Sequence, residues 1–137
     1  MKSQTVSFEK DLEVYSVEAV EFPNGVQKAH ESLHAYFDYS ENRRYFGLSQ
    51  LKNDGNLTYW AAVETRPDDD IRALKLETRN ISKGNYKCIE LKNFMSNIDG
   101  IGEIFGHLLK DPDIDTTSVA IEEYTRDGSC LCMMKIK

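Results

Sequence analysis

The sequence predicts an α+β fold built from a βαββ unit that occurs twice along the chain. Strand and helix patterns follow one another in the same order in each half of the 137 residues, and such self-similarity indicates an internal repeat. The helix starts Asn24-Gly25-Val26 and Asp99-Gly100-Ile101 also correspond, and Leu33 and Leu108 are separated by the same offset. Because one unit alone cannot bury its helix well, we expect a single domain, with repeat halves at about 5–66 and 75–137 that share one core.

The first half contains signals for a strand, a helix and a hairpin. Residues 12–22 are rich in Val, Tyr and Phe and predict a strand, which residues 6–8 extend,. Apolar residues recur with helical spacing over 26–37 and predict an amphipathic helix whose apolar stripe packs on a sheet,. Residues 45–51 and 58–64 flank an Asp-Gly pair, so we expect them to form an antiparallel hairpin,.

The second half repeats this order. A strand over 86–91 precedes a helix that opens at Asp99 and carries apolar residues at helical spacing,. The segments 118–124 and 130–137 then flank Asp127-Gly128, which again predicts a hairpin,.

Charge and composition exclude several classes of function. The formal net charge is -6 and no basic patch is visible, which opposes binding to nucleic acid. No apolar run approaches the length of a membrane span,. The three cysteines lack metal-ligand spacing with histidine,. We therefore expect a cytoplasmic protein that uses neither cofactor nor metal and does not bind membranes.

One strand of the second half carries a candidate site. Alternation puts Ala120, Glu122 and Tyr124 on one face of this strand, with Glu123 on the other,. A carboxylate beside an aromatic hydroxyl on a largely buried strand can serve binding or proton transfer. The alternative interpretation is a solvated strand acid paired with a neighbouring lysine.

Three stretches resemble the GyrI-like small-molecule-binding domain, a SOUL/GyrI-type fold that serves as the effector-binding module of multidrug-responsive bacterial transcription activators. Ile81-Ser82-Lys83-Gly84-Asn85-Tyr86 resembles the family's Ile-Pro-Ala-Gly-x-Tyr segment, with Ser-Lys in place of Pro-Ala. Glu122-Glu123-Tyr124 matches its Glu-x-Tyr pattern, and 59–64 stands where the family has an aromatic-bearing strand. Phe105 or Leu109 stands where the family often has a tryptophan. No helix-turn-helix segment is attached, so we expect a stand-alone version of the module.

The resemblance implies one antiparallel sheet with both helices on one face and a ligand cleft on the other. A small amphipathic ligand, cationic or aromatic, would bind there with Glu122 as the central acid. Strand parity, with Tyr59 and Phe46 assigned to the helix side, completes the predicted set of ligand-binding residues: Glu122, Tyr124, Trp60, Tyr45, Glu64 and Tyr86,.

Three other functions remain open at this stage. Some relatives of the family hydrolyse small electrophiles, which would make Glu122 a general base assisted by Tyr124. A protein-interaction inhibitor of the gyrase-inhibitor type is a second alternative, with an unknown protein partner. A metallopeptidase is a third, because His30-Glu31-Ser32-Leu33-His34 matches His-Glu-x-x-His,. The metallopeptidase needs a third ligand, and we expect the His30 edge of the helix to pack toward the sheet.

Overall fold

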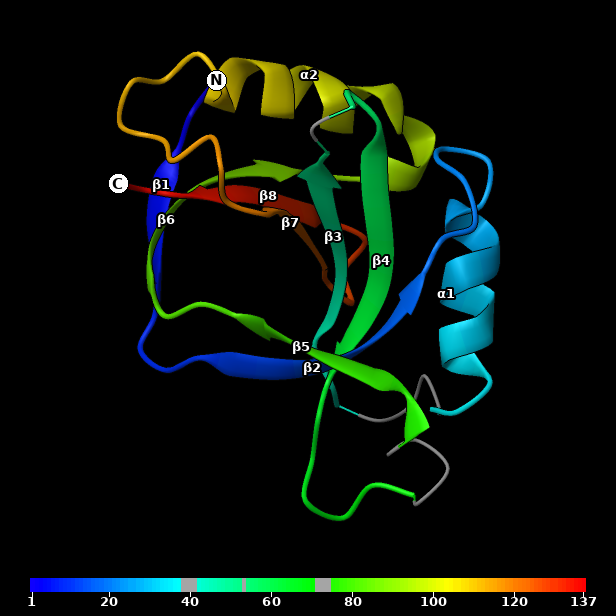
Figure 1. Ribbon diagram of the computed structural model, residues 1–137. Coiled ribbons are helices and arrows are strands. Elements are labelled where there is room, and N and C mark those ends of the chain that lie inside the picture. Colours follow the sequence, from blue (N-terminus) through cyan, green and yellow to red (C-terminus); the bar gives the residue numbers. More distant parts are fainter. Residues whose placement is uncertain (38–41, 53, 71–74) are drawn as a thin grey trace.

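The computed structural model describes residues 1–37, 42–52, 54–70 and 75–137 and contains one curled antiparallel sheet (Figure 1). Its eight strands lie in the order β1-β6-β8-β7-β3-β4-β2-β5. The strands are β1 (Gln4–Phe8), β2 (Leu12–Glu18), β3 (Tyr45–Leu51), β4 (Leu57–Glu64), β5 (Glu77–Ile81), β6 (Gly84–Leu91), β7 (Ala120–Tyr124) and β8 (Cys130–Lys135).

Two helices pack on the outer face of the sheet. Helix α1 (Val26–His34) contacts β4 and β2, whereas α2 (Asp99–Leu108) contacts β8 and β6. Figure 1 shows both helices outside the curl, with α2 across its top and α1 along its right-hand side. The predicted α+β class, with one antiparallel sheet and two helices, is confirmed. Within the described residues, neither helix is long and apolar enough to cross a membrane.

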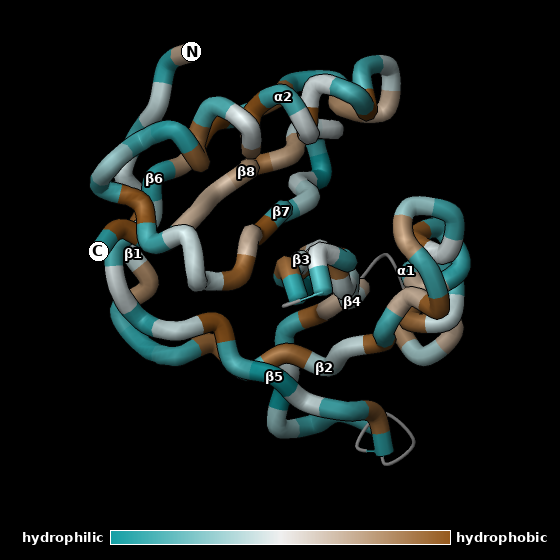
Figure 2. Tube along the Cα trace, turned by 45° about the horizontal axis from the view of Figure 1, so that its top comes forward, coloured by the Kyte–Doolittle hydropathy of each residue, from teal (hydrophilic) through white to brown (hydrophobic). Residues whose placement is uncertain are grey.

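Both faces of the sheet are buried, which is the feature that positions the site. The outer face packs against α1 through Tyr59 and Val63 and against α2 through Cys130 and Cys132. Figure 2 looks into the curl of the sheet. A separate core lies inside this curl, and its larger residues are Phe8, Val14, Phe46, Leu48, Trp60, Ile81, Tyr86, Ile121 and Met133. Alternation along a strand therefore separates two apolar environments here.

The two halves are joined by an exchange of edge strands. Strand β1 of the first half pairs with β6 of the second, and β5 of the second half pairs with β2 of the first. The sequence Glu77-Thr78-Arg79-Asn80-Ile81 is polar, as suits a strand at the edge of a sheet,. That polarity is why the hydrophobic pattern did not predict β5. Residues 6–8, expected as an extension of the next strand, form part of a separate strand.

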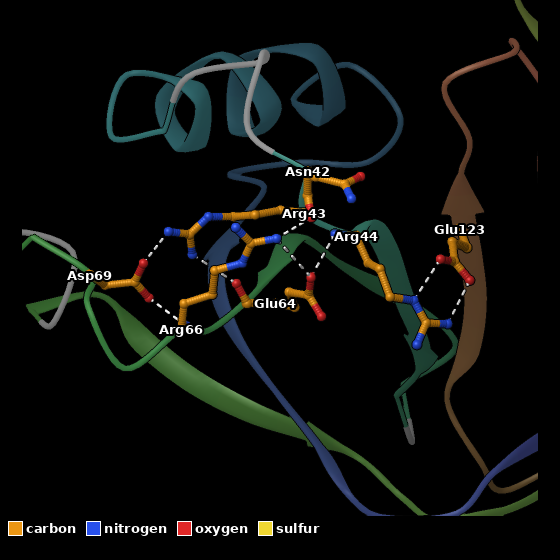
Figure 3. A network of polar contacts seen from close by, with 7 residues as sticks. All are labelled: Asn42, Arg43, Arg44, Glu64, Arg66, Asp69 and Glu123. Carbon is orange, nitrogen blue, oxygen red and sulfur yellow. Dashed lines mark hydrogen bonds and ion pairs between the residues drawn. The ribbon is translucent and has the colours of Figure 1, made fainter.

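A polar network joins the start of β3 to the end of β4 (Figure 3). The Arg44 guanidinium donates to both carboxylate oxygens of Glu123, at 2.8 and 2.9 Å. The backbone N–H of Arg44 donates to Glu64 at 3.2 Å, and Arg66 lies 3.8 Å from the same carboxylate. Arg43 forms a buried ion pair with Asp69. Both Glu64 and Glu123 are therefore already paired with cations.

Candidate functional site

A continuous chain of hydrogen bonds runs across the outer face from β7 to α1. The Tyr124 hydroxyl donates to Glu122 Oε1 at 2.9 Å, and its oxygen lies 2.7 Å from the Tyr59 hydroxyl. The Tyr59 hydroxyl in turn lies 2.6 Å from His30 Nε2. We refer to Glu122, Tyr124, Tyr59 and His30 as the carboxylate–tyrosine chain. Its members come from β7, β4 and α1, so it depends on tertiary structure.

Gly47 of β3 makes room for this chain. It pairs with Glu122 on one side and with Ala61 on the other, so it stands between the two tyrosines. A Cβ atom at this position would lie 2.2 Å from the Tyr59 hydroxyl oxygen and 2.4 Å from that of Tyr124. Both distances are far below van der Waals contact, so only glycine lets the two hydroxyls meet above β3.

Aromatic rings enclose both tyrosines. Phe22, in the segment before α1, stacks on Tyr59 with ring centroids 5.9 Å apart. Phe94, in the short 3-10 helix η2 (Phe94–Ser96) before α2, stacks on Tyr124 at 5.4 Å. Phe22 is 46% exposed, so the outer part of this apolar surface is accessible from solvent, whereas Tyr59 beneath it is buried. Rings at these distances provide both dispersion contact and an electronegative face.

Burial controls the protonation of Glu122. Loss of solvent raises the pKa of Glu122 to about 7, and the hydrogen bond from Tyr124 opposes part of that rise,. No Lys or Arg forms an ion pair with Glu122 in the described part of the chain. Near neutral pH this carboxyl group therefore loses its proton readily, and its charge lacks a counter-ion.

The remaining groups of the chain stay neutral. Burial, helped by the nearby His34, lowers the pKa of His30 to about 4. Burial and the Glu122 charge raise the pKa of Tyr59 and of Tyr124 above the usual value for tyrosine. When Glu122 is ionised, Tyr124 donates to it, so Tyr59 donates to Tyr124 and His30 Nε2–H donates to Tyr59. The ionised carboxylate thus orients every proton in the chain.

Comparison with known proteins identifies solved structures of the same fold. No family model matches the sequence, and no curated protein matches it. SAV2435 bound to tetraphenylphosphonium has a TM-score of 0.73 and 14% identity, over 100% of this chain and 94% of that one. A hydrolase from Listeria innocua has a TM-score of 0.64 and 12% identity, over 99% and 92%. A candidate bacterial transcription regulation protein from Staphylococcus aureus has a TM-score of 0.68 and 12% identity, over 100% of this chain and 99% of that one.

This chain shares the fold of these proteins.

The structure divides the six predicted site residues between the two faces of the sheet. Glu122 and Tyr124 lie on the outer, helix-covered face, as does Tyr45, whose ring centroid is 5.1 Å from that of His34. Trp60 and Tyr86 belong to the inner core. The expectation that Glu122 and Trp60 share one face, away from the helices, is therefore wrong.

The placement of Glu122 in the cleft came from the family resemblance, and the error on β3 came from strand parity. The assignment of Tyr59, Ala61 and Val63 to the helix side is confirmed, but Phe46 and Leu48 lie in the inner core rather than toward the helices. Because both faces of the sheet are apolar, the more hydrophobic set on a strand does not identify the helix side.

The other predicted residues have different surroundings. Glu64 lies in the polar network of Figure 3, where Arg66 and the Arg44 backbone already contact its carboxylate. Trp60 and Tyr86 line an inner cavity of about 570 Å³. A cavity therefore does lie on the face opposite the helices, but Glu122 is not part of it.

Residue patterns had not identified His30, Tyr59 or Gly47 as members of the site. His30 had been considered only as a metal ligand. Its Nε2 instead bonds to Tyr59, and the expected packing of its helix edge toward the sheet is confirmed. Among the described residues, no group of three His, Cys, Asp or Glu side chains is placed to hold a metal. A glycine inside an otherwise bulky strand was the available signal for Gly47.

Proposed function

We propose that the protein binds small organic cations with aromatic groups at the carboxylate–tyrosine chain. The observation that carries this proposal is Glu122, a half-buried carboxylate with no cationic partner among the described residues. An unpaired buried carboxylate is unfavourable, and a bound cation removes that penalty.

The surrounding side chains suit the same ligand. Tyr124 bonds directly to the carboxylate and Tyr59 reaches it through Tyr124, while Phe22 and Phe94 stack on these two rings. Each ring in contact with a desolvated cation contributes roughly 0.5–2 kcal/mol. A delocalised cation that carries phenyl groups would use both the charge and the rings.

Charge also distinguishes this site from the inner cavity. Arg79 and Lys135 outnumber Asp115 in the lining of the inner cavity, so its net charge disfavours cations, whereas the carboxylate–tyrosine chain attracts them. The structural neighbour SAV2435 with bound tetraphenylphosphonium supports a cation ligand for this fold. The Glu122-Glu123-Tyr124 motif supports a GyrI-like effector-binding role, as does the Staphylococcus aureus neighbour.

Calorimetric titration with tetraphenylphosphonium at pH 8 tests the proposal. We expect saturable binding to the wild-type protein and a loss of affinity of about tenfold or more in Glu122→Gln, because a charge-assisted contact disappears. Glu123→Gln is the matched control, since it removes the adjacent carboxylate from the opposite face. Equal affinity in the wild type and Glu122→Gln would refute the proposal.

A second candidate function is hydrolysis of a small electrophile such as an epoxide. Two observations favour it: the pKa of Glu122 is raised to about 7, near the optimum for a general base, and Tyr124 lies at 2.9 Å as a proton donor,. The Listeria innocua neighbour is a hydrolase. Glu122 would take a proton from water as the water oxygen attacks and opens the ring, and Tyr124 would protonate the alkoxide. Glu122 would then return its proton to Tyr124 across their hydrogen bond. Turnover of styrene oxide that persists in Glu122→Gln would exclude this function.

A further inference from the structure

A second potential binding site lies inside the curl of the sheet, on the face opposite the carboxylate–tyrosine chain. The cavity of about 570 Å³ is lined by Trp60 of β4, Arg79 of β5, Tyr86 of β6 and Lys135 of β8. Leu48, Ile81, Val119 and Ile121 give it apolar walls. Its volume lies within the usual range for small-molecule sites.

Two hydrogen-bond donors at this cavity are buried without a partner in the described part of the chain. They are the indole Nε1–H of Trp60 and the Nε–H of Arg79. Trp60 is 7% exposed, and the Arg79 guanidinium lies 4.0 Å from the centroid of its ring. The hydroxyl of Thr58, in an adjoining cavity of about 360 Å³, is also unpartnered. An acceptor brought into the cavity would relieve this unfavourable state.

The charges at the cavity favour an anion. Arg79 pairs only distantly with Glu77, at 3.5 Å, and the Glu77 side chain is 76% exposed. Lys135 contributes a second cation. Asp115 offsets part of the Lys135 charge, but its Oδ1 already accepts hydrogen bonds from the backbone N–H and the hydroxyl of Thr117. Arg79 and Lys135 are thus the two cations at the cavity, and the Arg79 guanidinium, which lies on the Trp60 ring, suits a planar carboxylate,.

We propose that the inner cavity binds a small aromatic carboxylate. The carboxylate contacts Arg79 on the side that Lys135 makes electropositive, and the ring packs against the apolar walls near Trp60 and Tyr86. The protein would then carry two sites of opposite charge preference on the two faces of one sheet.

Fluorescence of Trp60, the one tryptophan of the chain, reports on this cavity directly. Titration with 4-nitrobenzoate should quench the fluorescence saturably, whereas the neutral 4-nitrobenzamide should bind about tenfold more weakly or more. Arg79→Gln should lower the affinity for 4-nitrobenzoate by about tenfold or more. Lys135→Met should also weaken it, and provides the test if Arg79→Gln does not fold by circular dichroism.

Two controls separate this proposal from the function proposed for the other face. Glu122→Gln should leave 4-nitrobenzoate affinity unchanged, and Lys110→Gln, beside α2, corrects for the change in overall charge. Equal affinity for the acid and the amide, quenching that never saturates, or unchanged affinity in a folded Arg79→Gln protein would overturn the assignment.

Discussion

Tyr124 donates a hydrogen bond of 2.9 Å to the carboxylate of Glu122, two residues earlier on the same strand. Side chains at this spacing lie on one face of β7, and that face is covered by both helices rather than turned away from them. The hydroxyl also contacts Tyr59 at 2.7 Å, and through it His30 of α1. Protonation of Glu122 is therefore linked to hydrogen bonds that reach a helix.

We predict that Glu122 makes the fold less stable as pH rises from about 4.5 to about 7. The pKa of Glu122 is raised from 4.5 to about 7 by burial, so the folded state holds a proton that the unfolded state has lost. Below about pH 4.5 Glu122 makes its full contribution to the free energy of unfolding. About 3 kcal/mol of that contribution is lost once the pH is above 7. Urea unfolding should therefore show Glu122→Gln more stable than the wild type at pH 8.

The wild type must be compared with Glu122→Gln because titration of His30 changes stability with pH in the opposite direction. Its pKa is lowered from 6.5 to about 4, so its contribution to stability increases as pH rises through that interval. The two effects partly cancel in the wild type, and the difference between wild type and Glu122→Gln isolates the carboxyl group. A stability difference that does not change between pH 5 and pH 8 would contradict the predicted burial of Glu122.

Affinity for the cation should increase as pH rises, whereas the contribution of Glu122 to stability decreases. Tetraphenylphosphonium keeps its charge at every pH, so it binds the ionised form of Glu122. Below the pKa of about 7, binding must displace a proton, and affinity should fall by up to about tenfold per pH unit. Calorimetry at pH 6, 7 and 8 should show affinity rising and then levelling off. The slope should be absent in Glu122→Gln.

Gly47→Ala should destabilise the protein by about 1–3 kcal/mol, a cost typical of overpacking. The new Cβ would lie 2.2 and 2.4 Å from the hydroxyl oxygens of Tyr59 and Tyr124. Thermal unfolding measures the effect, and the cost should be smaller in a Tyr59→Phe background.

Gly102→Ala is the matched control for this substitution. It lies within α2, where an added Cβ meets nothing within 4 Å. We expect this change to stabilise the protein by about 0.5–1 kcal/mol through helix propensity. If both substitutions have the same effect, the close approach at Gly47 is not the cause.

Glu123→Gln should lower stability by about 1 kcal/mol while leaving cation affinity intact. Glu123 accepts two hydrogen bonds from Arg44, and their side chains are 13% and 40% exposed. Bidentate geometry raises the contribution above that of an ordinary surface pair, and partial exposure limits it. Glu90→Gln, at an exposed position of β6, should change stability little. If Glu123→Gln leaves the free energy of unfolding unchanged, solvent screens the ion pair between Arg44 and Glu123.

The sequence predicted the repeat, both helices and the hairpins β3–β4 and β7–β8, because their apolar periodicity and Asp-Gly turns are local features. It did not predict β5, whose polar residues are stabilised by pairing with β2 across the exchange. It identified Glu122 and Tyr124 from their spacing, but not their neighbours. Tyr59, Gly47 and His30 approach them only through strand register and helix packing, which a short motif does not encode.

A crystal structure of the protein with tetraphenylphosphonium tests the central claim most directly. The proposal predicts the phosphonium beside the Glu122 carboxylate, with phenyl groups against Tyr59, Tyr124, Phe22 or Phe94. A phosphonium found instead in the inner cavity beside Trp60 and Arg79 would contradict it.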